Sequence, residues 1–145
     1  MQHDPGRTLA KQQSTGTILY VTDLTSDSDE TLASACDMAD RNRAAIELIH
    51  VVDVVQEQSN PDAQMGILYR LETLARRLNN LRRNIVPLLL FGTLEDAITK
   101  RAWDTKASMV VFGNDSSSSA VMQERLARIR RRVSCPVFII SARTA

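Results

Sequence analysis

The chain has 145 residues, of which 43% are hydrophobic and 24% charged, and its formal net charge is +1 at pH 7. That length suits one domain with a buried core. The near-zero charge gives no electrostatic reason to expect nucleic acid or a membrane surface as a partner, and no apolar run reaches membrane-spanning length.

The first predicted elements follow an irregular N-terminal segment. Residues 1–15 mix Gly, Pro, Gln and charge without a period, so we expect a disordered leader before a single domain over residues 16–143. The β-branched, apolar "TILYVTD" (Thr17–Asp23) predicts a buried strand. The next stretch, Ser26–Arg43, opens with Ser and Asp and closes with Arg, a charge order that favours a helix.

The middle of the chain repeats this alternation. "AAIELIHVVDV" (Ala44–Val54) predicts a second strand, and the leucine stripe of Ala63–Arg83 predicts a long amphipathic helix. "NIVPLLLF" (Asn84–Phe91) predicts a third strand, in which Pro87 suits a sheet edge because proline cannot donate to a neighbouring strand. A threonine cap and early acids then predict a short helix over Thr93–Asp104.

The last predicted elements are a strand at Ser108–Gly113, a helix at Ala120–Val133 and a strand at Pro136–Ala142. Strands that are apolar on both faces and alternate with helices predict the α/β class, with one doubly wound parallel sheet covered by helices on both faces. Ligands of such sheets bind beyond the carboxyl ends of the strands, which here means the loops after Asp23 and Gly113.

Asp23 is the first candidate binding residue, and its position leaves two interpretations open. It can accept hydrogen bonds from a ligand, or it can help to cap the helix that follows. The acids after it lack calcium-loop spacing, and no metal site is predicted. His50 is interpreted as a core histidine, and no motif supplies a nucleophile or a base. We therefore expect no catalytic residues and no enzyme activity.

Two further patterns have competing interpretations. Arg125, Arg128 and Arg132 recur at helical spacing, as in an anion-binding patch or a solvated helix face, and we favour the solvated face. Cys36 and Cys135 are far apart with no CxxC pair, which indicates free thiols and a cytoplasmic location. The loop "FGNDSSSS" after the fourth predicted strand matches neither a GxGxxG turn nor a Walker loop.

Five segments, in order and at nearly the same spacing, resemble the universal stress protein family: "ILYVTDLT" (Ile18–Thr25), "LIHVVD" (Leu48–Asp53), "FGTLEDAI" (Phe91–Ile98), "MVVFG" (Met109–Gly113) and "SCPVFII" (Ser134–Ile140). The resemblance covers about residues 17–141. It implies a Rossmann-like sheet of the adenine nucleotide alpha hydrolase type, in strand order 3-2-1-4-5. It also implies a cytoplasmic stress-response protein with an unknown protein partner, and a homodimer formed through the last strand, Pro136–Ala142.

The resemblance also implies an adenine position. In ATP-binding members the base lies over the end of the first strand, and the positions that match are Val21, Thr22 and Asp23, with Ile46 on the second strand. Adenine-nucleotide binding is thus a possible property of this chain, with ATP or AMP as the ligand.

The family's phosphate loop, which resembles G-x2-G-x9-G-[ST], matches less well. Gly113 fits its first glycine and Ser116 replaces the second, while Gln123 and Glu124 occupy the glycine–hydroxyl pair. A carboxylate about 4 Å from a phosphate opposes binding by about 4 kcal/mol at an effective dielectric near 20. That exceeds the 1.5–3 kcal/mol of one hydrogen bond to a charged group, taken as an order of magnitude.

The resulting prediction is a non-catalytic stress-response binding protein with a degraded ATP phosphate loop and no required cofactor. The alternative is a working adenine-nucleotide binder with at most slow hydrolysis. A related α/β nucleotide enzyme is disfavoured, because "TDLTSDSD" carries neither an HxGH-type nor an SGGxDS-type loop.

Overall fold

The computed structural model describes residues 16–24, 29–53, 61–81, 85–113 and 120–140. Strands and helices alternate along them as the sequence predicts, in the order β1 (Thr17–Val21), α2 (Asp29–Arg41), β2 (Ala45–Val52), α3 (Pro61–Leu81), β3 (Ile85–Phe91), α4 (Leu94–Thr105), β4 (Met109–Phe112), α5 (Ala120–Arg132) and β5 (Val137–Ile139). The expected leader, residues 1–15, lies outside the described residues.

The five strands form one parallel sheet in the order β3-β2-β1-β4-β5. This confirms the doubly wound sheet and its strand order. Pro87 lies in β3 opposite Leu48 of β2, and β3 is an edge strand. The sequence placed this proline at an edge for the right reason, because its missing N–H would break a ladder in the middle of the sheet.

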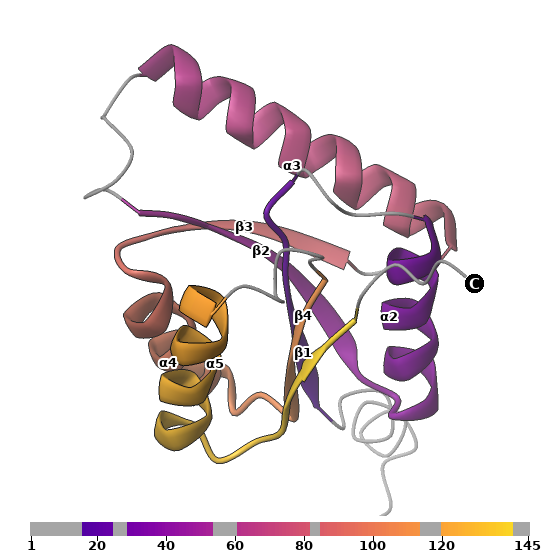
Figure 1. Ribbon diagram of the computed structural model, residues 1–145. Coiled ribbons are helices and arrows are strands. Elements are labelled where there is room, and N and C mark those ends of the chain that lie inside the picture. The colour runs from indigo at the N-terminus through magenta and orange to yellow at the C-terminus, as the bar shows by residue number, and fades with distance from the viewer. Residues whose placement is uncertain (1–15, 25–28, 54–60, 82–84, 114–119, 141–145) are drawn as a thin grey trace, which may run out of the picture.

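Two helical layers cover the sheet, with α2 and α3 on one face and α4 and α5 on the other (Figure 1). Successive strand residues point to opposite faces, so Tyr20 joins the α2/α3 core and Val21 joins the α4/α5 core. On the helices, the buried stripes include Leu71, Leu74 and Leu78 in α3. Full burial of each such leucine contributes about 1.5–3 kcal/mol.

One predicted stripe residue is not part of the core. Met65 has the helical spacing of the apolar stripe predicted within Ala63–Arg83, but this side chain is 65% exposed near the start of α3. A helical period alone does not tell how far a helix is covered by the sheet beneath it. None of the helices in the described part of the chain is long and apolar enough to cross a membrane.

The carboxyl ends of β1, β2 and β4 meet at one edge of the sheet. The Thr22 N–H donates to the Ile49 carbonyl over 2.9 Å, and the Gly113 N–H donates to the Val21 carbonyl over 3.1 Å. Helix α4 also begins near here, where the Thr93 hydroxyl accepts a 3.2 Å hydrogen bond from the Asp96 N–H, as the predicted threonine cap requires. This edge is the switch point at which doubly wound sheets bind ligands.

Candidate functional site

A pocket of about 190 Å³ opens at the carboxyl edge of the sheet. Three strands and two helices contribute its lining, which consists of Val21, Thr22, Asp23, His50, Val51, Asp53, Leu94, Phe112, Met122 and Arg125. Its lining combines apolar side chains with charged groups from three separate segments. A flat apolar group with polar edges suits such a site.

The segment after β1 brings three predicted residues to this pocket. Val21, Thr22 and Asp23 all line it, as the sequence led us to expect. The following residue, Leu24, has a left-handed φ of 68°, and the Leu24 N–H donates to the Thr22 hydroxyl over 2.9 Å. Because left-handed backbone is costly for a leucine, the surrounding contacts must hold this turn in place. The alternative role of Asp23 as part of a helix cap depends on residues 25–28, which lie outside the described residues.

His50 is a pocket residue that sequence reasoning assigned to the core. Its side chain is half-buried and lines the pocket. The Nδ1 atom lies 2.9 Å from the Thr22 carbonyl oxygen, which can only accept, so Nδ1 carries the proton and donates. This bond ties β2 to the segment after β1 and fixes the orientation of the ring. The core interpretation of His50 was therefore wrong about its burial, since the side chain is only half-buried and lines a pocket, although its ring nitrogen has a hydrogen-bond partner.

Gly113 lies at the pocket's edge, but tight packing explains its identity. A Cβ at this position would lie 1.9 Å from the hydroxyl oxygen of Tyr20, a side chain that is fully buried. Its φ is outside the left-handed range, and its N–H is already bonded to the Val21 carbonyl. A phosphate therefore cannot use this N–H without breaking the sheet bond. Ser116, the other predicted loop residue, lies outside the described residues.

Ile46 does not join the other predicted site residues. It is fully buried in the α2/α3 core and pairs with Ile18 and Ile85 near the start of β2. The carboxyl edge lies near the other end of the strand, where Ile49 accepts the hydrogen bond from Thr22. Ile46 thus lies at the start of β2, as the resemblance implied, but at the opposite end of this strand from the pocket, and it is not among the lining residues.

Arg125 of α5 is the cation of the pocket. Its side chain is 24% exposed, and its guanidinium lies between two carboxylates, 3.6 Å from Asp53 Oδ2 and 3.5 Å from Glu95 Oε1. Neither acid was singled out from the sequence. No sequence signal links them, because the three residues belong to the end of β2, the start of α4 and the first half of α5.

Two other arginines of α5, Arg128 and Arg132, also contact α4. Arg128 donates to Glu95 Oε2 over 3.1 Å, and Arg132 lies 2.9 Å from Asp96 Oδ1. Hydrogen bonds from Arg132 and Thr93 hold the pKa of the Asp96 carboxyl below its usual value. The solvated-face interpretation of these arginines was thus incomplete, because they hold two helices together.

The match to the family's phosphate loop placed Glu124 beside the phosphates, and the structure shows where its side chain lies. Its carboxylate is 72% exposed and lies 3.5 Å from Arg128, one turn further along α5. It is not among the described residues that line the pocket, and the expected clash between Glu124 and a phosphate stays a prediction, because residues 114–119 of the loop lie outside the described residues. Among the described residues, the acids that line the pocket are Asp23 and Asp53, and Glu95 lies beside Arg125.

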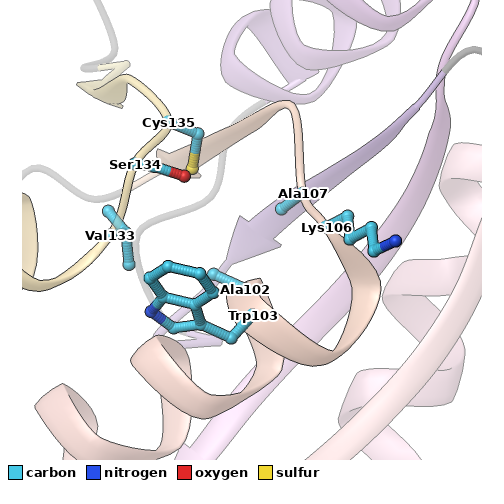
Figure 2. Close-up of a pocket in the computed structure, with 7 residues that line it drawn as sticks. All are labelled: Ala102, Trp103, Lys106, Ala107, Val133, Ser134 and Cys135. Atoms are coloured by element: carbon cyan, nitrogen blue, oxygen red, sulfur yellow. The ribbon is translucent and has the colours of Figure 1, made fainter.

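A second hollow of about 140 Å³ lies at the opposite, amino edge of the sheet, between the ends of α4 and α5. Figure 2 shows the Trp103 ring on one side of it and Ser134 and Cys135 on the other. The indole Nε1 donates to the Arg132 carbonyl over 3.0 Å, which fixes the ring. Burial raises the pKa of the Cys135 thiol, so this cysteine is a poor nucleophile.

Comparison with known proteins gives a family match and structural neighbours. The model of the universal stress protein family matches residues 15–141, and a search of curated proteins finds no match. A universal stress protein from Archaeoglobus fulgidus has a TM-score of 0.70 at 14% identity, over 91% of this chain and 98% of that one. A structure of the Archaeoglobus fulgidus universal stress protein in complex with dAMP has a TM-score of 0.67 at 15% sequence identity, over 86% of this chain and 97% of that one.

A third similar structure is a universal stress protein in complex with cAMP. Its TM-score is 0.68 at 21% identity, over 88% of this chain and 98% of the other. At these identities the likeness shows a common fold and does not carry a ligand from one chain to another. The strand order and the family match agree with the resemblance that the sequence segments suggested.

Proposed function

The chain belongs to the universal stress protein family, and from that premise we propose that it is a non-catalytic stress-response binding protein whose ligand site is the pocket at the carboxyl edge. The observation that carries the proposal is the convergence of Val21, Thr22 and Asp23 on a pocket at the sheet's switch point. Two proteins of similar fold have adenine nucleotides in their structures, cAMP in one and dAMP in the other. The proposed ligand class is therefore an adenine nucleoside or nucleotide.

The size of the pocket supports a small ligand group. Its volume of about 190 Å³ is below the roughly 300–1,000 Å³ of sites that enclose drug-sized molecules. The lining includes the apolar residues Val51, Leu94 and Phe112, and we propose that a purine ring packs against them with Asp23 at its polar edge. A triphosphate chain would have to extend beyond the described lining.

The charges support weak binding of ATP. Asp23 and Asp53 both line the pocket, and Arg125 already lies between Asp53 and Glu95. Each close carboxylate–phosphate pair opposes binding by about 4 kcal/mol near an effective dielectric of 20. The Gly113 N–H is bonded within the sheet, so one donor of the proposed degraded phosphate loop is missing. We therefore propose that ATP is not held firmly, and no reaction is assigned to the pocket.

Titration calorimetry with Mg-ATP, together with a phosphate-release assay, tests this proposal. We expect a dissociation constant weaker than about 100 μM, equivalent to about −5.5 kcal/mol, and no phosphate release above the uncatalysed rate. Tighter ATP binding that is lost in Asp23→Ala but kept in Asp37→Ala would favour the alternative, a working ATP or AMP binder with slow hydrolysis. Asp37 is a suitable control because it pairs with Arg41 on the surface of α2.

The assembly that we propose is a homodimer formed through β5. This strand is one edge of the sheet, and its Phe138 is 43% exposed. An exposed apolar residue on an open edge strand favours pairing with a second copy. Light scattering after size exclusion should give twice the monomer mass at micromolar protein, and Phe138→Glu should shift it to the monomer. A monomeric wild-type protein would contradict the proposal.

A cytoplasmic location is part of the same proposal. Cys36 and Cys135 are both free, and they pack in cores on opposite faces of the sheet. Two thiols separated by the sheet cannot form a disulfide within the chain. Fractionation of cells that express the full chain tests the location.

A further inference from the structure

We propose that Arg125 is the phosphate-contacting residue of the carboxyl-edge pocket and that it limits the ligand to an adenine nucleotide with a single phosphate group. This inference rests on the proposed function, since it concerns the ligand of the same pocket. It assigns the phosphate to a side chain of α5. The backbone N–H of Gly113 is committed to the sheet and is not the phosphate donor.

The position of Arg125 is the first argument. Among the residues that the structure describes, it is the only arginine or lysine that lines the pocket. The Arg125 side chain is only 24% exposed, and the same pocket is lined by the apolar residues Met122, Phe112 and Leu94. A cation there interacts strongly with an anion, because water screens the pair less than at an open surface.

The loose contacts of Arg125 are the second argument. Its distances of 3.6 Å to Asp53 and 3.5 Å to Glu95 exceed the 2.7–2.9 Å that is usual, as an approximate range, for charge-assisted hydrogen bonds. Glu95 Oε1 indeed has no hydrogen-bond partner, although it is buried. The Arg125 guanidinium is thus held to Glu95 by charge alone. Its N–H groups can donate hydrogen bonds to the oxygens of a phosphate.

Glu95 also has another cation available. Its second oxygen, Oε2, accepts a 3.1 Å hydrogen bond from Arg128. If Arg125 turns toward a phosphate, the Glu95 carboxylate therefore keeps a charged partner and is not stranded in a buried position. The free-energy cost of turning Arg125 away from Glu95 is therefore small. Glu95 is a positioning residue that competes with the ligand for Arg125.

The balance of charge limits the ligand to one phosphate. Arg125 provides a single cation, while Asp23 and Asp53 line the same pocket. A second or third phosphate adds negative charge without any further described cation in the lining. The expected order of affinity is therefore AMP above adenosine, with ATP no tighter than AMP.

An NMR titration of the full chain with adenosine, AMP and ATP tests the inference. In the wild type we expect AMP to bind about tenfold tighter than adenosine, the effect of about one hydrogen bond between charged groups. In Arg125→Gln this ratio should fall to about one while adenosine binding is unchanged. Arg132→Gln, the same change two turns along α5 and outside the pocket lining, should keep the wild-type ratio.

Two further variants separate a binding role from a structural one. Arg125→Lys keeps a charge and should restore part of the AMP preference. Glu95→Gln removes the competing carboxylate and should tighten AMP, but not adenosine, by up to about fivefold, the range of a weak ion pair. If a folded Arg125→Gln protein keeps the wild-type ratio of AMP to adenosine affinity, the inference about Arg125 is overturned and the proposed function is not. Absence of binding of all three ligands to the wild type would overturn the inference and the proposed function together.

Discussion

The two edges of the sheet carry hollows of similar size and opposite character. At the carboxyl edge, Asp23, Asp53 and Arg125 from three separate segments line a pocket together with apolar side chains. At the amino edge, the hollow beside Trp103 is lined mainly by small or apolar side chains, with Lys106 as its charged residue. Of these two hollows, only the first combines apolar side chains with several charged groups.

This difference follows from the topology. Strands β1, β2 and β4 end at the carboxyl edge, where their chains turn to opposite faces, so their last residues diverge and leave a crevice. At the amino edge the chain arrives from helix ends, and the gap between α4 and α5 is partly filled by the indole of Trp103. Volume alone therefore does not identify the functional hollow, and the chemistry of its lining does.

The largest expected effect concerns the carboxyl edge. Gly113→Ala should lower the free energy of unfolding by about 2–3 kcal/mol, because the new Cβ would lie 1.9 Å from the buried Tyr20 hydroxyl. Gly66→Ala is the matched control, since a Cβ at Gly66 in α3 meets nothing within 4 Å. It should stabilise by about 0.5–1 kcal/mol through helix propensity. Denaturant unfolding measures both, and equal effects would show that the Tyr20 contact does not explain the glycine.

A smaller effect is expected at the amino edge. Trp103→Phe removes the donor of the 3.0 Å hydrogen bond to the Arg132 carbonyl. The side chain is 61% exposed, so water can replace the lost donor, and we expect a loss of only about 0.5–1 kcal/mol in the free energy of unfolding. Nucleotide affinity should stay at the wild-type value. A change in AMP affinity would mean that the two edges are coupled.

Cys135 offers a test of the chemical environment at the amino edge. Burial raises the pKa of its thiol, so at any pH near neutrality less of it is thiolate than in a free cysteine. Reaction with a disulfide reagent should be slower than for a free cysteine, and its rate should still rise with pH where the free thiol has levelled off. The variant Cys36→Ala isolates this signal. A rate equal to that of free cysteine would show that the hollow is open to water.

For the last prediction we expect no change: AMP binding at the carboxyl edge should leave the fluorescence of Trp103 at the amino edge unaffected. Trp103 is the only tryptophan in the chain, so its emission reports on the amino edge alone. Saturation with AMP should shift the NMR resonances of His50, which lines the carboxyl-edge pocket, and leave the emission maximum of Trp103 unchanged. An emission change that follows the same binding curve as the His50 shift would show that the ligand, or its effect, reaches the amino edge.

The fold was largely predictable because its signals are local. Apolar runs of strand length alternate with amphipathic stretches, and their residues appear as β1 to β5 and α2 to α5 within a few positions of the expected ends. The last strand was predicted over Pro136–Ala142; the structure places it at Val137–Ile139, and residues 141–142 lie outside the described residues. The part of the site that adjoins β1 was also predictable, because the end of a first strand is a fixed place in a doubly wound fold.

The rest of the site depends on contacts between distant residues. His50 reaches the Thr22 carbonyl, and Arg125 meets Asp53 and Glu95, only after three elements have been brought to one edge. The sequence by itself determined the parallel sheet, its edge proline and the aspartate after β1, since these follow from periodicity and backbone chemistry. Only the tertiary structure decided that Gly113 makes room for Tyr20 and that Glu124 faces away from the pocket. Such choices depend on which side chains share a space, and neither composition nor spacing along the chain records that.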